Sequence, residues 1–261
     1  RDEKIGLIQD KNRLLYCIFL QADKDERPSR KIFSTSIILS DIAIKIPGWT
    51  IPKPPPRKKN EVLHPAKYPE TLVSEFIELF SKPGDTILDP MVGTGSSIVA
   101  AIRSGRNGYG IDLMPEFVEI SRNRINEELK PSLFESFLPS SKGFVFQGDS
   151  TKLTSIRELE NITFDYAVTS PPYWSMLTNP GSENQEKRRK QNLRLVYSEN
   201  ENDLGNVHDY EQFLDLLESV YNQVAIKLKP GGGLTVVVKN VKRDHIVFPL
   251  AWDIVYRLCK P

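Results

Sequence analysis

Cysteine is scarce in this sequence of 261 residues, which holds only Cys17 and Cys259, near opposite ends of the chain. Two cysteines are too few for a disulfide framework or a cysteine-based zinc site, and such low usage is typical of proteins from a reducing compartment. Long apolar runs are absent too, since none approaches the roughly 20 residues that span a membrane as a helix. These absences favour a cytoplasmic protein without a membrane anchor.

Net charge is nearly absent as well, because 35 lysines and arginines stand against 34 aspartates and glutamates, which leaves +1. A balanced total does not exclude a nucleic-acid partner, since local patches of charge decide such binding. We expect an amino-terminal accessory segment with a proline-rich linker over residues 1–59, and the main domain over residues 60–261. Within the first segment, the apolar residues 14–20 fit a helix or a strand, whereas residues 31–46 favour a strand.

A glycine loop follows the first clear buried strand of the main domain. Residues 86–88 are apolar and lead into Asp89-Pro90-Met91-Val92-Gly93-Thr94-Gly95-Ser96-Ser97, after which a helix is predicted up to Arg103. Gly93 and Gly95 allow the backbone to turn tightly and to approach a ligand, while the helix start offers free N–H groups. This order of strand, glycine loop and helix is typical of a nucleotide site.

Two further predicted strands end in carboxylates. The second strand ends at Asp112, 23 residues after Asp89, and in doubly wound folds an acid about 20 residues along bonds the ribose hydroxyls of a nucleotide. The third strand, residues 144–146, leads to Asp149. Asp149 is either another polar group at the same sheet edge or the cap of a helix over residues 150–159.

The fourth predicted strand, residues 164–168, runs into Thr169-Ser170-Pro171-Pro172-Tyr173-Trp174. Two consecutive prolines cannot continue a strand, because each lacks an N–H group and has a fixed φ. The chain must therefore leave the sheet as a stiff loop that holds Tyr173 and Trp174 at a set distance from Ser170. This arrangement suits a flat substrate with polar edges. The alternative is a proline turn followed by two aromatic side chains of the core.

The remaining elements complete an alternating pattern. Helices are predicted between the strands and over residues 209–229 and 249–258, with a fifth strand at 234–238 after a helix stop at the glycines 231–233. Strands that alternate with helices imply right-handed crossovers and a mainly parallel sheet. The sequence therefore predicts an α/β fold.

A polar segment, residues 179–206, carries five clustered cations: Lys187, Arg188, Arg189, Lys190 and Arg194. Such a cluster beside a site suits a phosphate backbone, and it equally suits a solvated face. A second, shorter basic loop is predicted over residues 239–245.

Three motifs together resemble the amino-directed DNA methyltransferases that use S-adenosylmethionine. They are the glycine loop that starts at Asp89, the Ser170-Pro171-Pro172-Tyr173 stretch, and His64-Pro65-Ala66-Lys67-Tyr68-Pro69 before the glycine loop. The resemblance covers roughly residues 60–258. It implies a Rossmann-like methyltransferase fold with a mainly parallel twisted sheet flanked by helices, double-stranded DNA as partner, and an association with the nucleoid through DNA. A restriction or specificity partner is also expected, since the family includes the methyltransferases of restriction–modification systems.

The resemblance also assigns roles to residues. Asp89, Gly93 and Gly95 would surround the methionine part of the cofactor, Asp112 would hold the ribose, and Asp149 would meet the adenine amine. The expected cofactor-binding set is Lys67, Tyr68, Asp89, Pro90, Gly93, Gly95, Ser96, Asp112, Leu113, Asp149 and Ser150. The expected catalytic residues are Ser170, Pro171, Pro172 and Tyr173, and the expected DNA-binding residues are Trp174, Arg188, Arg189, Lys190 and Arg194. No metal is expected.

In this family, serine at the first position of the four-residue motif goes most often with methylation of cytosine at its exocyclic N4. Adenine N6 is the first alternative. An RNA base amine, a protein glutamine amide or a non-catalytic cofactor-binding subunit are further ones. Methylation at carbon 5 is disfavoured, because it needs a thiolate adduct and no Pro-Cys pair is present.

The sequence departs from the family pattern in two ways. Only 20 residues separate Asp149 from Ser170, which leaves no room there for a target-recognition domain. The two strands that normally follow the last helix are also missing, so that either the chain is truncated or strands of the amino-terminal segment replace them. Target recognition then depends on residues 1–60, on residues 175–206, or on a part outside this chain.

Overall fold

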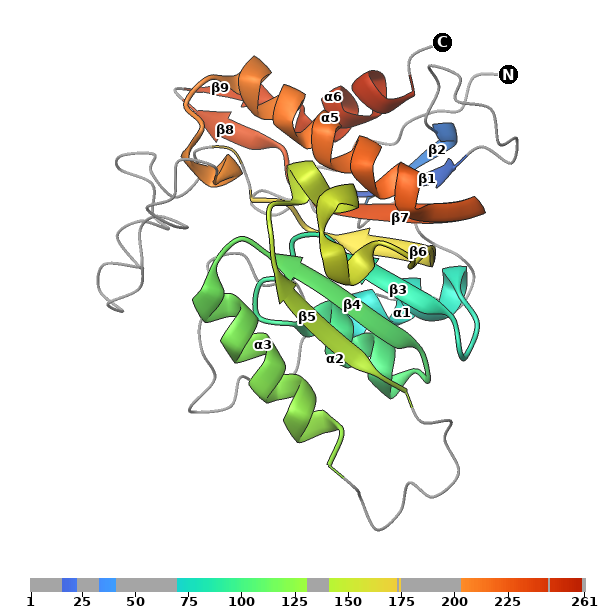
Figure 1. The fold of residues 1–261 in the computed structure, drawn as a ribbon. Helices are drawn as coiled ribbons and strands as arrows, with labels where there is room; N and C mark the ends of the chain where they lie inside the picture. The colour runs from blue at the N-terminus through green and yellow to red at the C-terminus, as the bar shows by residue number, and fades with distance from the viewer. Residues whose placement is uncertain are drawn as a thin grey trace.

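The computed structural model describes residues 16–22, 33–40, 70–130, 141–172, 174, 203–243 and 245–259. Its helices and strands alternate along the chain (Figure 1). In chain order they are β1 Tyr16–Ala22, β2 Phe33–Ser40, α1 Glu70–Phe80, β3 Thr86–Asp89, α2 Ser96–Arg103, β4 Asn107–Asp112, α3 Pro115–Glu128, β5 Gly143–Gln147, the 3₁₀ helices η1 Ser150–Ser155 and η2 Arg157–Leu159, β6 Phe164–Thr169, the 3₁₀ helix η3 Leu204–Asn206, α5 Tyr210–Lys227, β7 Leu228–Val238, β8 Val241–Arg243, β9 Ile246–Phe248 and α6 Leu250–Leu258.

One seven-stranded sheet organises the described part of the chain, in the order β2-β1-β7-β6-β3-β4-β5. The five strands from β7 to β5 are parallel. The strand order reverses between β3 and β6, and ligands of open α/β sheets bind at such a reversal, outside the carboxyl ends of the strands. The predicted α/β fold is confirmed.

The amino-terminal segment supplies the last two strands of this sheet. β1 pairs antiparallel with β7, from Tyr16 opposite Val238 to Gln21 opposite Gly233, and β2 pairs antiparallel with β1. The described part of the ambiguous run at residues 14–20, from Tyr16 onward, is therefore a strand. Strands from the amino-terminal segment stand where the family pattern expects two strands after the last helix. The linker lies outside the described residues, so the division of the chain at residue 59 stays a prediction.

Helices cover both faces of the sheet, and the alternation of side chains along each strand explains how (Figure 1). On β3, Ile87 packs into a cluster with α1 and α2, while its neighbour Leu88 packs into the larger cluster with α5 and α6. The helix α3 packs with α2 over β5. None of the described helices is long and apolar enough to cross a membrane.

Three local predictions were wrong, for separate physical reasons. The glycines after α5 do not end the helix, because β7 already begins at Leu228 and passes through them. Its pairing with β6 jumps from Leu228 to Gly233, so residues 229–232 form an irregular bulge. The helix predicted over residues 150–159 is a pair of 3₁₀ helices. The loop predicted over residues 239–245 contains β8, which pairs with β9.

Candidate cofactor and substrate site

The loops that follow the parallel strands meet in one pocket at the carboxyl edge of the sheet. It collects nine of the predicted site residues: Pro90, Gly93, Asp112, Leu113, Asp149, Ser150, Ser170, Pro171 and Pro172. Four separate stretches of sequence, which follow β3, β4, β5 and β6, thus contribute to one cavity, as the position of their strands in the sheet predicted.

The glycine loop takes its shape from Asp89, which is fully buried. One carboxylate oxygen of Asp89 accepts a hydrogen bond from the Met91 N–H group at 3.0 Å, and the other accepts one from the Ser97 hydroxyl at 2.5 Å. Gly93 and Gly95 both have positive φ, 53° and 83°, which an L side chain rarely adopts. Asp89 therefore holds the loop, and it does not itself line the pocket. Gly95 and Ser96 do not line the pocket either.

Asp112 ties the first two strand ends together. Its carboxylate accepts hydrogen bonds from the Gly93 N–H group at 2.8 Å and from the Met114 N–H group at 2.9 Å. Burial raises the pKa of Asp112 to about 7, with a smaller contribution from the negative charges of Asp89 and Asp203, although the two hydrogen bonds oppose the shift. The Asp112 carboxyl group therefore changes its protonation state near neutral pH.

Asp149 fulfils both of its predicted roles at once. Its carboxylate accepts hydrogen bonds from the backbone N–H and the hydroxyl of Thr151, at 2.9 and 2.7 Å, and so caps η1. It also lines the pocket. The neighbouring Ser150 donates a hydrogen bond to the carbonyl of Pro90, which links the third strand end to the glycine loop.

Asp203 is a pocket residue that the sequence did not reveal. It is 8% exposed and lines the pocket with Leu204, and its carboxylate accepts a hydrogen bond from the Gly205 N–H group at 2.8 Å. No predicted strand precedes it, so the rule of polar groups at strand ends could not find it. Four other lining residues were missed because they have no polar side chain: Met91, Met114, Phe117 and Gly148.

The pocket is negatively charged, since three aspartates and no lysine, arginine or histidine line it among the described residues. The proline motif also lines the pocket, with Ser170, Pro171 and Pro172. A cationic ligand with hydroxyl groups suits the carboxylates, and a neutral polar group suits the serine.

Trp174 does not lie at the surface of the pocket. It is 3% exposed, its ring contacts those of Tyr210 and Phe248 at centroid distances of 4.9 and 4.7 Å, and its indole N–H group donates to the His208 carbonyl at 3.2 Å. Stacking on a base would break all of these contacts. For Trp174, the alternative of a core aromatic side chain is therefore the correct one.

The other predicted residues lie outside the described part of the chain. They are Lys67, Tyr68, Tyr173, Arg188, Arg189, Lys190 and Arg194.

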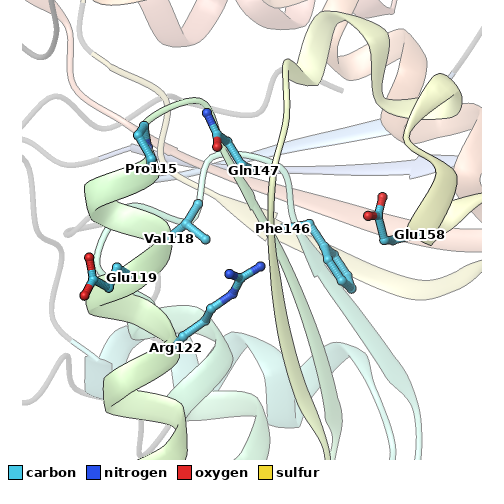
Figure 2. A pocket seen from close by; sticks show the side chains of 7 residues that line it. All are labelled: Pro115, Val118, Glu119, Arg122, Phe146, Gln147 and Glu158. Carbon is cyan, nitrogen blue, oxygen red and sulfur yellow. The ribbon is translucent and has the colours of Figure 1, made fainter.

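A second cavity, of about 500 Å³, lies between α3 and β5 (Figure 2). Arg122 extends from α3 toward Phe146, and its Nε donates to the Val145 carbonyl at 2.9 Å. Glu119 and Glu158 also line this cavity, and none of the predicted site residues does. It is the larger of the two spaces, but the strand-end loops and the proline motif meet only in the first.

Residues 19–123 match the N6/N4 methyltransferase family model, which is described as DNA methylase. The match shows that this segment, which includes the glycine loop and Asp112, is similar to the N6/N4 DNA methylase family. Enzymes of this family depend on S-adenosylmethionine, so the predicted cofactor agrees with the family.

Two relatives match this chain over only part of their own length. The type II methyltransferase M.MthZI of Methanothermobacter thermautotrophicus is 42% identical over 74 residues, which are 28% of this chain and 21% of that protein. The DNA adenine methyltransferase YhdJ of Escherichia coli is 33% identical over 84 residues, 31% of this chain and 29% of that protein. The chain thus spans well under half of the length of these relatives. A solved S-adenosylmethionine-dependent methyltransferase from Clostridium acetobutylicum is similar with a TM-score of 0.37 and 16% identity, over 62% of this chain and 46% of that one.

Proposed function

We propose that this chain carries the catalytic core of a DNA methyltransferase that transfers a methyl group from S-adenosylmethionine to the exocyclic N4 amine of cytosine. One observation supports this most directly. The strand-end carboxylates and the Ser170-Pro171-Pro172 motif line the same pocket. A cofactor held by the former would lie beside a base amine held by the latter. The type II relatives suggest a restriction–modification setting, with the protein in the cytoplasm and bound to the nucleoid.

The charge of the pocket suits this cofactor. S-adenosylmethionine carries a sulfonium and an ammonium cation, and the three aspartates of the pocket provide the opposite charge. Gly93 lets the backbone approach the ligand without a Cβ atom. Asp112 would hold the ribose hydroxyls and Asp149 the adenine amine. When bound, the cofactor supplies a methyl group on a positively charged sulfur.

The residues of the proline motif would hold the target amine. A base inside a duplex is out of reach, so the nucleotide must be flipped out at a cost of a few kcal/mol. The Ser170 hydroxyl and the Pro171 carbonyl would accept hydrogen bonds from the amine, which localises its lone pair on nitrogen. Tyr173, outside the described residues, would stack on the base, and stacking contributes about 1–3 kcal/mol per base. Positioning would then be the main catalytic effect.

Adenine N6 is the second candidate for the target amine. Ser170 favours cytosine by the family resemblance, but a relative that matches part of this chain is a DNA adenine methyltransferase. Both bases present a planar ring with an exocyclic amine, so the described pocket suits either.

The test uses the purified protein, labelled S-adenosylmethionine and unmethylated genomic DNA. After the DNA is digested to nucleosides, mass spectrometry should find N4-methylcytosine in the wild-type reaction, and at least a hundredfold less with Ser170→Ala. If mass spectrometry finds N6-methyladenine instead, the target base is adenine and not cytosine. Methyl transfer only to RNA or protein, or cofactor binding without any transfer, would refute the proposal.

A further inference from the structure

The hairpin of β8 and β9 leaves the sheet beside the proline motif. It follows β7, and Val236 of β7 pairs with Thr169, the residue just before Ser170. Two neighbouring parallel strands therefore deliver the hairpin and the proline motif to the same edge of the sheet. In Figure 1 the hairpin lies at the upper left, on the side toward which the β4 arrowhead points.

The base of the hairpin is fixed to the core through the motif's own tryptophan. The Phe248 ring packs edge-on against Trp174 at a centroid distance of 4.7 Å, and the Arg243 guanidinium lies 5.0 Å from the centre of the same indole ring. Val241, the cross-strand partner of Phe248, is 6% exposed. Trp174 thus couples the position of the hairpin to the proline motif four residues upstream.

The rest of the hairpin is exposed, and it is both apolar and basic. Ile246 is 61% exposed and Val247 is 58% exposed. Their cross-strand partners are cations, since Arg243 pairs with Ile246 and Lys242 with Val247. From Lys239 to Phe248 the sequence holds three cations and one acid: Lys239, Lys242, Arg243 and Asp244. A surface of this kind matches a polyanion that also offers apolar faces.

We propose that the β8–β9 hairpin contacts the DNA beside the flipped nucleotide. Lys242 lies against the phosphates, while Ile246 and Val247 pack on the base faces that become exposed where the target base leaves the stack. DNA supplies both chemistries at one place, because apolar side chains are the usual wedges at unstacked base steps. The inference rests on the proposed function, since it places a duplex across the proline motif.

Two variants separate the two kinds of contact, and each has a matched control at the opposite edge of the sheet. Lys242→Gln removes the phosphate contact, and Lys82→Gln removes another exposed lysine, located before β3. The double change Ile246→Ser with Val247→Ser removes the apolar contact, and Ile226→Ser removes a side chain that is 66% exposed near the end of α5.

The measurement is the affinity for a pool of random-sequence duplexes over a range of salt concentrations, followed by methyl transfer to genomic DNA. Lys242→Gln should lower the slope of log affinity against log salt by about 1. The double change should raise the KM for DNA at least tenfold and leave cofactor affinity and Tm unchanged. Both controls should behave as wild type.

Each result bears on one claim. If the wild-type protein methylates DNA and the hairpin variants match it in salt slope and in KM, the hairpin is not a DNA contact. If the wild-type protein neither binds nor methylates DNA, the proposed function fails and this inference fails with it.

Discussion

At the scale of single residues, the protonation of Asp112 links the pocket to pH. Its pKa of about 7 is raised from the ordinary value of 3.8, mainly by burial. Folding thus favours the protonated form of Asp112. The stability that this form contributes to the folded state is fully present below about pH 4, and it is lost as the pH rises through 7. A ligand that donates hydrogen bonds to the carboxylate has the opposite preference, because it needs the charged form.

We therefore expect cofactor affinity to rise with pH. The charged fraction of Asp112 grows from about one tenth at pH 6 to about nine tenths at pH 8, so the affinity should increase up to about tenfold over that range. Calorimetric titration with S-adenosylmethionine measures it. Asp112→Asn should bind weakly and lose this pH dependence, and a flat profile in the wild-type protein would show that Asp112 does not hold the ribose.

Asp203 should act on the cofactor through its charge. Its negative charge raises the pKa of Asp112, so Asp203→Asn should shift the pH profile of cofactor binding to lower pH. The same change removes an anion from the pocket. Asp203→Asn should weaken the binding of S-adenosylmethionine several-fold more than the binding of S-adenosylhomocysteine, because S-adenosylhomocysteine lacks the sulfonium charge. Equal losses for both ligands would mean that Asp203 serves only to cap η3.

At the scale of elements, the contact between β4 and the glycine loop is testable by a compensating pair. A Cβ atom at Gly110 would lie 2.7 Å from Cγ2 of Val92, and a β-branched side chain has little freedom to move away. Gly110→Ala should cost about 1–3 kcal/mol of stability and weaken cofactor binding by displacing the loop.

Val92→Ala combined with Gly110→Ala should restore part of both losses, because the two Cγ methyl groups are gone while the Cβ of residue 92, 2.9 Å from the added Cβ, remains. Urea unfolding and cofactor titration of the two single variants and the double variant form the cycle. If the losses of stability and of cofactor affinity in the double variant equal the sum of the losses in the two single variants, the contact does not set the position of the loop.

Elements with a regular apolar pattern over many residues or with a fixed motif were predictable from the sequence. Short elements, and those that depend on distant partners, were not. The helices α2, α5 and α6 have regular apolar spacing or a glycine loop before them, and their bounds agree with the prediction within a few residues. The run at residues 14–20 was ambiguous because its partner, β7, lies more than 200 residues away. The pocket followed from strand ends, which is why Asp203, after no strand, was missed.

At the scale of the whole molecule, the amino-terminal strands decide whether β7 is an edge strand of the sheet. β1 pairs along the edge of β7, a strand in which Val236, Val237 and Val238 are fully buried. An uncovered apolar edge strand pairs readily with other chains and promotes aggregation. An accessory segment, in contrast, could be removed without such an effect.

Deletion of residues 1–46 distinguishes these two roles. Because it removes β1 and β2, we expect the shortened chain to unfold at a lower temperature and to aggregate, as seen by light scattering during thermal unfolding. Deletion of residues 1–12 is the matched control, since it ends before β1, and it should leave Tm and cofactor affinity unchanged. A soluble chain that lacks residues 1–46 and keeps the wild-type Tm and cofactor affinity would show that the main domain is complete without β1 and β2.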